Sequence, residues 1–264
     1  MGHFVEPKVF LLTETKASTE GVGDFLSELG VPDWHTDSRS DGEMLIEIAG
    51  KSCYLSFDTS LNKNLTRTGT RDNETYIQEG IISTKHGSVL EHPTVTFALV
   101  HVSRVFTHEL VRHRVGTAFS QVSGRYVRTD EINMFYPSVL HKYGEEMRAL
   151  WSKAQSEMEN WIKEMERITD INNIKDFSLK KKLTSAFRRL IGNGQENHII
   201  FSCNHRTLRH VIAMRTAPEA EEEIRIVFGK IFDIVKYRYK GIYADASVEV
   251  VDGLPWVKFK HERV

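Results

Sequence analysis

Arginine is concentrated in two stretches of a chain whose formal net charge is only −1. Residues 104–128 hold five arginines, no lysine and a single acid, Glu109. Residues 204–215 add Arg206, Arg209 and Arg215, again without lysine or acid. The planar guanidinium binds phosphate or the imide edge of a base through two hydrogen bonds. These stretches indicate nucleotide binding, although solvated faces and helix-terminal charges would give the same composition.

The segment that follows the first arginines has groups suited to an anion. If Arg112 and Arg114 lie in the last turn of a helix, a rotation of about 100° per residue points them to nearly opposite sides, between two ligands. Ser123, Gly124 and Arg125 come shortly afterwards. A hydroxyl, a glycine that lets a backbone N–H approach and a guanidinium together form a candidate phosphate cradle.

Histidine and cysteine give no metal or nucleophile pattern. His108 and His113 are five residues apart rather than four, so they lie about 140° apart on a helix, and we predict no metal site. Cys203 ends an apolar run, which favours burial over a reactive thiol. For His92 and His101, which flank an apolar segment, we expect satisfied core histidines.

Composition excludes several classes of protein. The 264 residues are 40% hydrophobic and 27% charged, which is ordinary for a globular protein and sufficient for a large core. No apolar run approaches the roughly 20 residues that span a bilayer, and the first residues do not resemble a secretion signal. With only Cys53 and Cys203, a reduced, cytoplasmic setting is expected. A near-zero net charge argues against general polynucleotide binding.

Hydrophobic patterning predicts the elements that position these side chains. Short apolar or extended runs predict strands over Val9–Leu12, Leu45–Ile48 and Val122–Arg128, and a strand buried on both faces over Thr94–Val102. An apolar stripe predicts a helix over Glu145–Ile168. Further helices are expected around Val22–Leu29, over Val105–Arg114 with Ser103 as N-cap, over Leu183–Ile191, over Arg206–Met214 and from Pro218 through Val235. No linker or repeat interrupts the chain, so we expect one domain over residues 1–264.

Four ordered segments resemble the motifs of the flavin-dependent thymidylate synthases, the ThyX family. Residues 86–92, His-Gly-Ser-Val-Leu-Glu-His, look like the family's His-x-Ser/Thr-x-x-Glu-His segment. Residues 112–114, Arg-His-Arg, with residues 123–126, Ser-Gly-Arg-Tyr, are similar to the family signature. Residues 187–190, Phe-Arg-Arg-Leu, resemble the arginine-bearing helix ahead of the family's last binding segment, and the block from Asn204 to Arg215 resembles that last segment. The resemblance covers about residues 80–240, and four ordered segments are more specific than any one of them.

Two departures from the family's pattern bear on the substrate. The loop between Arg114 and Ser123 is one residue longer than is usual in the family, which leaves open whether Ser120 or Ser123 faces the nucleotide; we favour Ser123, because Gly124 follows it. Glu109 stands where members often have glutamine. A carboxylate there would change the pairing to the pyrimidine, or be protonated or salt-bridged.

The resemblance implies an α+β fold with a central, mostly antiparallel sheet flanked by long helices. It implies the conversion of dUMP to dTMP with methylene-tetrahydrofolate as one-carbon donor and NADPH-reduced FAD as reductant, without a cysteine nucleophile. By position, Arg215 is the residue expected to act catalytically. A guanidinium against the N3/O4 edge of uracil would stabilise negative charge that develops on the ring.

The resemblance also implies two sets of contacts. The flavin is expected to contact His86, Ser88, Glu91, Arg112, His113, Arg114, Gln121, Asn204, Arg206 and His210. The nucleotide is expected to contact Glu109, Arg112, Gln121, Ser123, Gly124, Arg125, Arg188 and Arg215. In the family these groups come from different subunits of a homotetramer, so we expect a homotetramer here.

Three alternatives stay open from the sequence. A close variant methylates another uridine nucleotide such as UMP. A non-catalytic RNA- or nucleotide-binding module would use the same arginines and show strongly salt-dependent binding to polynucleotide. A zinc hydrolase is disfavoured by the histidine spacing.

Overall fold

The computed structural model describes residues 2–57, 71–128 and 131–264. Its centre is a four-stranded antiparallel sheet with strand order β2-β3-β6-β4. These strands are β2 (Lys8–Glu14), β3 (Thr94–Ser103), β4 (Thr117–Gln121) and β6 (Glu196–Asn204). The register places Phe97 opposite Leu11 on one side and Phe201 on the other. The sheet confirms the α+β class and the strand expected at Val9–Leu12.

One face of this sheet is buried and the other is half-exposed. Phe97 and Leu99 point into the main core, which also holds side chains of α4 (Arg104–Leu110), α7 (His205–Arg215) and α8 (Glu222–Arg238). On the other face, Phe10 and Ile200 remain 51% and 36% exposed. The prediction that Thr94–Val102 is buried on both sides is therefore wrong, because side chains alternate between the two faces and the described chain covers only one.

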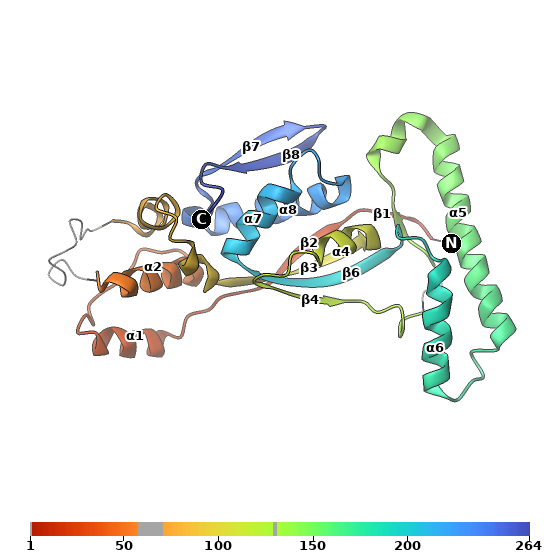
Figure 1. Cartoon of the computed structure of the whole chain (residues 1–264), viewed down its shortest axis with the longest axis horizontal. Coiled ribbons are helices and arrows are strands. Elements are labelled where there is room, and N and C mark those ends of the chain that lie inside the picture. The colour runs from red at the N-terminus through yellow and green to blue at the C-terminus, as the bar shows by residue number, and fades with distance from the viewer. Residues whose placement is uncertain (1, 58–70, 129–130) are drawn as a thin grey trace.

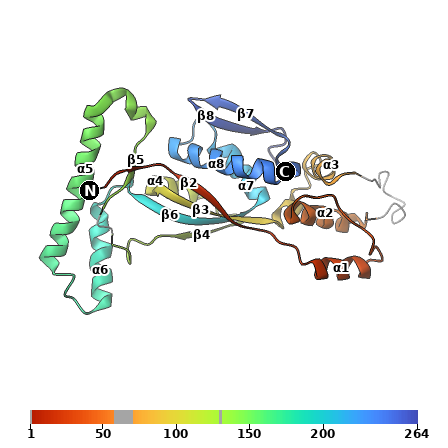
Figure 2. The ribbon, with the colours of Figure 1, turned by 180° about the vertical axis from the view of Figure 1, so that it is seen from behind.

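Helices lie at both ends of the sheet (Figures 1 and 2). The expected long helix is α5 (Gly144–Thr169), and it stands beside α6 (Phe177–Phe187) at one end. At the other end are α1 (Thr19–Glu28), as expected, and α2 (Asp41–Tyr54). The remaining elements are β1 (Phe4–Val5), β5 (Met134–Phe135), β7 (Ala246–Val251), β8 (Leu254–Phe259), α3 (Asn73–Thr75), α9 (Lys240–Tyr243), η1 (Tyr76–Ile82), η2 (Gly87–Glu91), η3 (Ser138–Tyr143) and η4 (Arg188–Leu190).

The strand predicted over Leu45–Ile48 is wrong, because these residues lie within α2. Ser40 caps this helix by accepting a hydrogen bond from the backbone N–H of Glu43, at 3.2 Å. Ser40 and Glu43 match the S-x-x-E pattern, which is a helix-start signal visible in the sequence, and the Ser40 hydroxyl donates to the Glu43 carboxylate. The burial of Glu43, Ile46, Glu47 and Gly50 follows helical spacing, so the short apolar run is one side of a helix.

The other boundaries differ where local hydrogen bonds end an element. Residues 122–128 form a turn rather than a strand, since the backbone N–H groups of Tyr126 and Val127 both donate to the Ser123 carbonyl. Helix α4 ends at Leu110, four residues before the predicted end, although Ser103 caps it as expected. Helix α6 begins earlier than predicted, at Phe177, and α8 begins at Glu222, beyond Pro218.

Among the described residues, no helix is both long and apolar enough to cross a bilayer.

A buried acid predicts how stability changes with pH. Burial raises the pKa of Glu223 to about 7, against the effect of hydrogen bonds from the Ser103 N–H and hydroxyl. Between about pH 4.5 and 7 the unfolded chain therefore binds fewer protons than the folded one at this group, and the free energy of unfolding falls as pH rises. We expect Glu223→Gln to become increasingly stable relative to the parent across this window, by at most about 1.4 kcal/mol per pH unit.

Melting temperatures of both proteins from pH 4.5 to 8 measure this effect. Glu249→Gln is the control, because Glu249 is in an exposed ion pair with Lys258. If the melting temperatures of Glu223→Gln and the parent changed in parallel with pH, the raised pKa of Glu223 would be contradicted.

Candidate functional site

A cavity of about 480 Å³ lies where η2, the segment after α4, the start of α7 and residues 262–264 meet. We call it the cationic cavity. Its lining includes Glu91, Arg112, His113, Arg114, Arg206 and His210. These are six of the residues expected to hold the flavin, and three segments that are far apart in the sequence bring them together.

Two local features position these side chains. Helix α7 begins at its N-cap Asn204, whose side chain accepts a hydrogen bond from the Thr207 N–H at 2.9 Å, as the sequence predicts. Gly116 lies against this cap with φ +67°, and a Cβ there would be 2.4 Å from Asn204 Nδ2. A glycine is required on both counts. It allows the segment carrying Arg112 and Arg114 to pack against the start of α7.

The cations in the cationic cavity differ in how they are paired. Arg206 donates to Glu91 at 2.5 Å and to the Val264 carbonyl at 2.8 Å. Arg112 and Arg114 are exposed, and no acid in the described part of the chain pairs with them. Unpaired guanidinium groups beside a cavity favour an anionic ligand there.

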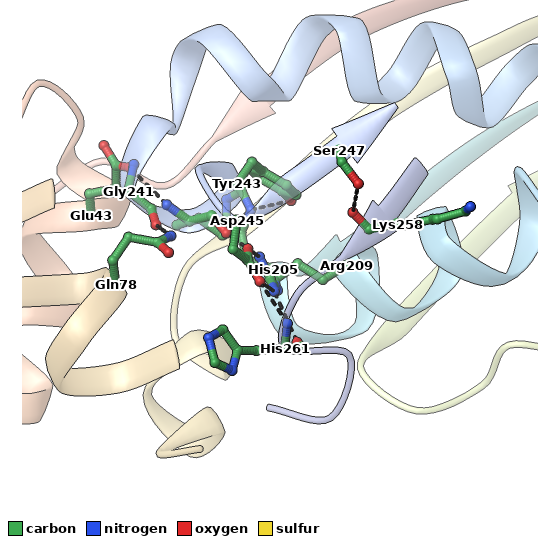
Figure 3. Close-up of polar contacts among 11 residues, drawn as sticks. Glu43, Gln78, His205, Arg209, Gly241, Tyr243, Asp245, Ser247, Lys258 and His261 are labelled. Carbon is green, nitrogen blue, oxygen red and sulfur yellow. Dashed lines mark hydrogen bonds and ion pairs between the residues drawn. The ribbon is translucent and has the colours of Figure 1, made fainter. Parts of the chain in front are cut away.

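Arg209 belongs to the same stretch but has a structural role. Its guanidinium pairs with Asp245 at 2.7 and 3.0 Å, and both side chains are about 95% buried. It also donates to the carbonyls of Ile242 and His261 and lies over the Phe259 ring. Figure 3 shows this network joining α7 to the chain around the β7–β8 hairpin. Arg209 thus fixes α7 and also borders the cationic cavity, which Arg206 lines as well.

Arg215 is held at the C-terminal end of α7 by two partners. Its Nε donates to His113 Nε2 at 2.8 Å, and its Nη1 pairs with Glu109 Oε2 at 2.8 Å. Burial, with Arg215 and His210 nearby, lowers the pKa of His113 to about 4. His113 is therefore neutral near pH 7 and accepts through Nε2, which places its proton on Nδ1. Glu109, for which the sequence left a protonated or a salt-bridged carboxylate open, forms a salt bridge with Arg215 in the structure.

A second pocket contains other residues of the expected nucleotide set. Gly124 and Arg188 line it together with Arg104, and it shares no lining residue with the cationic cavity. Burial and the neighbouring Arg188 both lower the pKa of Arg104. Neither guanidinium pairs with an acid of the described chain, whereas Arg128 in the same pocket contacts Glu166 at 3.3 Å. Two adjacent unpaired arginines indicate an anion site.

Arg104 was not singled out from the sequence, although it is the first of the five arginines in residues 104–128. Helix α4 connects the two places: Arg104 begins it in the second pocket, and Glu109 near its end meets Arg215. In one chain, Arg215 does not line the second pocket, which Gly124 and Arg188 line.

The remaining expected residues are spread around these sites. His86 is exposed and packs edge-on against Tyr54, at 5.8 Å between ring centroids, and Ser88 is exposed on η2. Gln121 donates to the Thr107 hydroxyl at 3.1 Å, so it joins β4 to α4. Ser123 accepts from the Arg125 N–H at 3.3 Å, and Arg125 faces Lys181 and Lys182 of α6.

The structure places the two serines differently. Ser120 lies on β4 opposite Ile200, on the half-exposed face of the sheet, while Ser123 shares a turn with Gly124 and Arg125. Ser123 is therefore the serine next to the second pocket.

The cysteine and histidine expectations have mixed outcomes. Cys203 is buried, and burial raises the pKa of its thiol far above the ordinary value, so it is no nucleophile. His113 lies beyond the end of α4 and bonds Arg215, so it shares no helical face with His108. The core-histidine expectation is wrong for two residues: His92 is exposed, and His101 is partly exposed and bonds Glu196.

Comparison with known proteins places this arrangement in a family. The family described as "Thymidylate synthase complementing protein" matches residues 36–239. A relative from Corynebacterium diphtheriae, named flavin-dependent thymidylate synthase, is 34% identical over 232 residues, which cover 86% of this chain and 88% of the relative. The chain belongs to the flavin-dependent thymidylate synthase family.

A second relative and two solved structures are also similar to this chain. A flavin-dependent thymidylate synthase from Mycobacterium tuberculosis is 34% identical over 212 residues, covering 76% of this chain and 78% of the relative. The crystal structure of ThyX from Helicobacter pylori with FAD and dUMP has a TM-score of 0.58 at 19% identity, covering 90% of this chain and 98% of that one. The UMP/dUMP methylase PolB from Streptomyces cacaoi, bound with 5-Br UMP, has a TM-score of 0.63 at 14% identity, covering 92% and 95%. At these identities, the two structures show that the ThyX-like fold is shared.

Proposed function

We propose that this chain catalyses the reductive methylation of dUMP to dTMP, with FAD as cofactor and with methylene-tetrahydrofolate and NADPH as co-substrates. The observation that carries this proposal is the cationic cavity, where six residues matching the family's flavin motifs meet from separate segments. The relatives named flavin-dependent thymidylate synthase support it over most of the chain's length.

The cationic cavity fits a dinucleotide. Arg112 and Arg114 offer guanidinium groups without acid partners to a pyrophosphate, and His210 and Arg206 share one face of α7. When bound, the flavin supplies the reducing equivalents for methyl formation. The chain's own residues bind and orient it there, and Glu91 fixes the guanidinium of Arg206 through their ion pair.

Arg215 is proposed as the catalytic residue. Its remaining Nη hydrogens donate to O4 of uracil, and its positive charge stabilises the negative charge that develops over N3 and O4. Glu109 and neutral His113 hold the guanidinium in place beforehand, so little reorganisation accompanies the reaction. Because the guanidinium stays protonated, Arg215 moves no proton itself.

The nucleotide site is proposed to form between subunits of a homotetramer. Arg215 lines neither the cationic cavity nor the second pocket of one chain, and a partner chain is proposed to supply the group of Ser123, Gly124, Arg125 and Arg188 next to Arg215. Exposed apolar side chains support the association: Phe10 and Leu12 on the half-exposed sheet face, and Trp161 on α5.

We also propose a cytoplasmic setting, supported by two unpaired cysteines.

Arg104 is proposed to bind the nucleotide phosphate together with Arg188. We expect Arg104→Ala to raise KM for the nucleotide by about 10- to 100-fold, since one charge-assisted hydrogen bond contributes about 1.5–3 kcal/mol. Flavin content is expected to stay unchanged, because Arg104 is not in the cationic cavity. Steady-state kinetics over a range of dUMP concentrations measures this, with the exposed Arg189→Ala as control. An unchanged KM for Arg104→Ala would remove Arg104 from the site.

A second candidate function is methylation of UMP. The specific observation in its favour is the Glu109–Arg215 salt bridge, which puts a carboxylate where members of the family often have glutamine. Turnover assays with dUMP and UMP in parallel decide between the two. Product from dUMP alone supports the main proposal, and product from UMP at a comparable or higher rate supports the second. Salt-dependent binding to RNA, with no product from either nucleotide, would favour the non-catalytic module.

A further inference from the structure

Two histidines and a glutamate meet where β3 and β6 pair, outside the cationic cavity. His101 comes from β3, and Glu196 and His198 come from β6. One nitrogen of each histidine and one carboxylate oxygen of Glu196 all lie within 4.8 Å of one another. Among the described residues, this is the one group of three or more such side chains within that distance.

The backbone is shaped to bring these side chains together. The β3–β6 register shifts between Leu99 and Val102, so that β3 carries one extra residue opposite His198. Such a bulge redirects a side chain and is common beside functional sites. His101 sits in it with φ +59°, a left-handed conformation that glycine adopts more easily.

The hydrogen bonds orient the carboxylate toward both rings. Asn133 Nδ2 donates to Glu196 Oε2 at 2.7 Å, which leaves Oε1 facing the histidines. Oε1 bonds His101 Nδ1 and lies 3.9 Å from His198 Nε2. The Glu196 side chain is 14% exposed, while those of His101 and His198 are 35% and 45% exposed, so the cluster is firmly held on one side and open on the other.

We propose that His101, Glu196 and His198 bind a divalent first-row transition-metal ion of the zinc class. Two imidazoles and a carboxylate are ligands that Zn²⁺ accepts, and the open side leaves room for a further ligand. Asn133 acts as the partner that orients a metal-binding carboxylate. Binding displaces the proton shared by His101 and Glu196, and it requires the proton of His198 to move from Nε2 to Nδ1. His198 then gives up the 3.2 Å hydrogen bond that its Nδ1 accepts from the His101 N–H.

This proposal is independent of the flavin and of the methylation reaction. None of the three residues lines the cationic cavity, although Glu196 borders the second pocket. An alternative role is a purely structural ion pair across the bulge. The two roles differ in what His198 does, because the ion pair needs only His101 and Glu196, whereas a metal site needs all three.

The test is equilibrium dialysis of the chelator-treated full chain against Zn²⁺, with the zinc bound per chain measured. We expect one zinc ion per chain in the parent. Affinity should fall by about tenfold or more in His198→Gln and in Glu196→Gln. The matched control is His35→Gln, which removes an exposed histidine elsewhere and should leave zinc binding unchanged.

A second measurement keeps the proposal testable if Glu196→Gln does not fold. At one fixed zinc concentration, zinc should raise the melting temperature of the parent and of His35→Gln equally, and that of His198→Gln by less. Zinc bound well below one per chain in the parent would overturn the proposal. So would zinc binding of parental affinity in His198→Gln, which would place any ion elsewhere.

Discussion

Replacing Arg215 by alanine is expected to lower kcat for dTMP formation by about 10²–10³-fold, while the protein keeps its flavin. The loss reflects the removal of a preorganised positive charge from the uracil ring, and effects of this size are typical when one such group is removed. Flavin should stay bound because the side chain of Arg215 is not among those that line the cationic cavity. Turnover with dUMP measures the fall in kcat, and the visible spectrum of the purified variant measures the flavin that stays bound.

The matched control for this substitution is Arg189→Ala, which removes an exposed arginine and should leave turnover unchanged. Near-normal turnover in Arg215→Ala would remove Arg215 from the catalytic role. Loss of flavin together with activity would show instead that the Arg215–His113 bond supports the cationic cavity.

Replacing Arg209 by alanine is expected to destabilise the protein by about 3–5 kcal/mol, because the change leaves the buried Asp245 carboxylate unpaired. The carbonyls of Ile242 and His261 lose their donor as well. Urea unfolding at one fixed concentration of protein and FAD measures the change in the free energy of unfolding. Arg209 lies in the same stretch as Arg206, so the result separates a structural arginine from a ligand-binding one.

Two further variants define the Arg209 effect. Arg167→Ala breaks an exposed pair with Glu164 and should cost less than about 1 kcal/mol. The double variant Arg209→Met/Asp245→Leu should recover much of the loss, since it removes both buried charges. An Arg209→Ala protein of parental stability that fails to hold flavin would show that Arg209 binds the ligand directly.

Much of the fold could be predicted from local sequence patterns. The α5 stripe and the Ser103 and Asn204 caps are determined by neighbouring residues, and they occur where predicted. The strand predicted over Leu45–Ile48 is wrong because a four-residue apolar run fits either a strand or one side of a helix, and the S-x-x-E pattern at Ser40 is the signal that indicates the helix.

The candidate site was predictable as a set of residues but not as an arrangement. The motifs identified Arg206 and Glu91, yet their ion pair joins positions 115 residues apart in the chain. Nothing local in the sequence distinguishes Arg209, which is buried by the C-terminal hairpin, from Arg206. The sequence does not single out Arg104, because its proximity to Arg188 on another segment arises only in the folded chain. The extent of a single domain over residues 1–264 stays a prediction.

The most direct test of the account is the visible spectrum of the purified protein under anaerobic conditions. We expect a bound flavin that is bleached by NADPH and regains its colour when dUMP and methylene-tetrahydrofolate are both added, with dTMP formed in step. A colourless protein that takes up no FAD would contradict the account, as would a flavin that NADPH reduces but that dUMP and the folate together leave reduced.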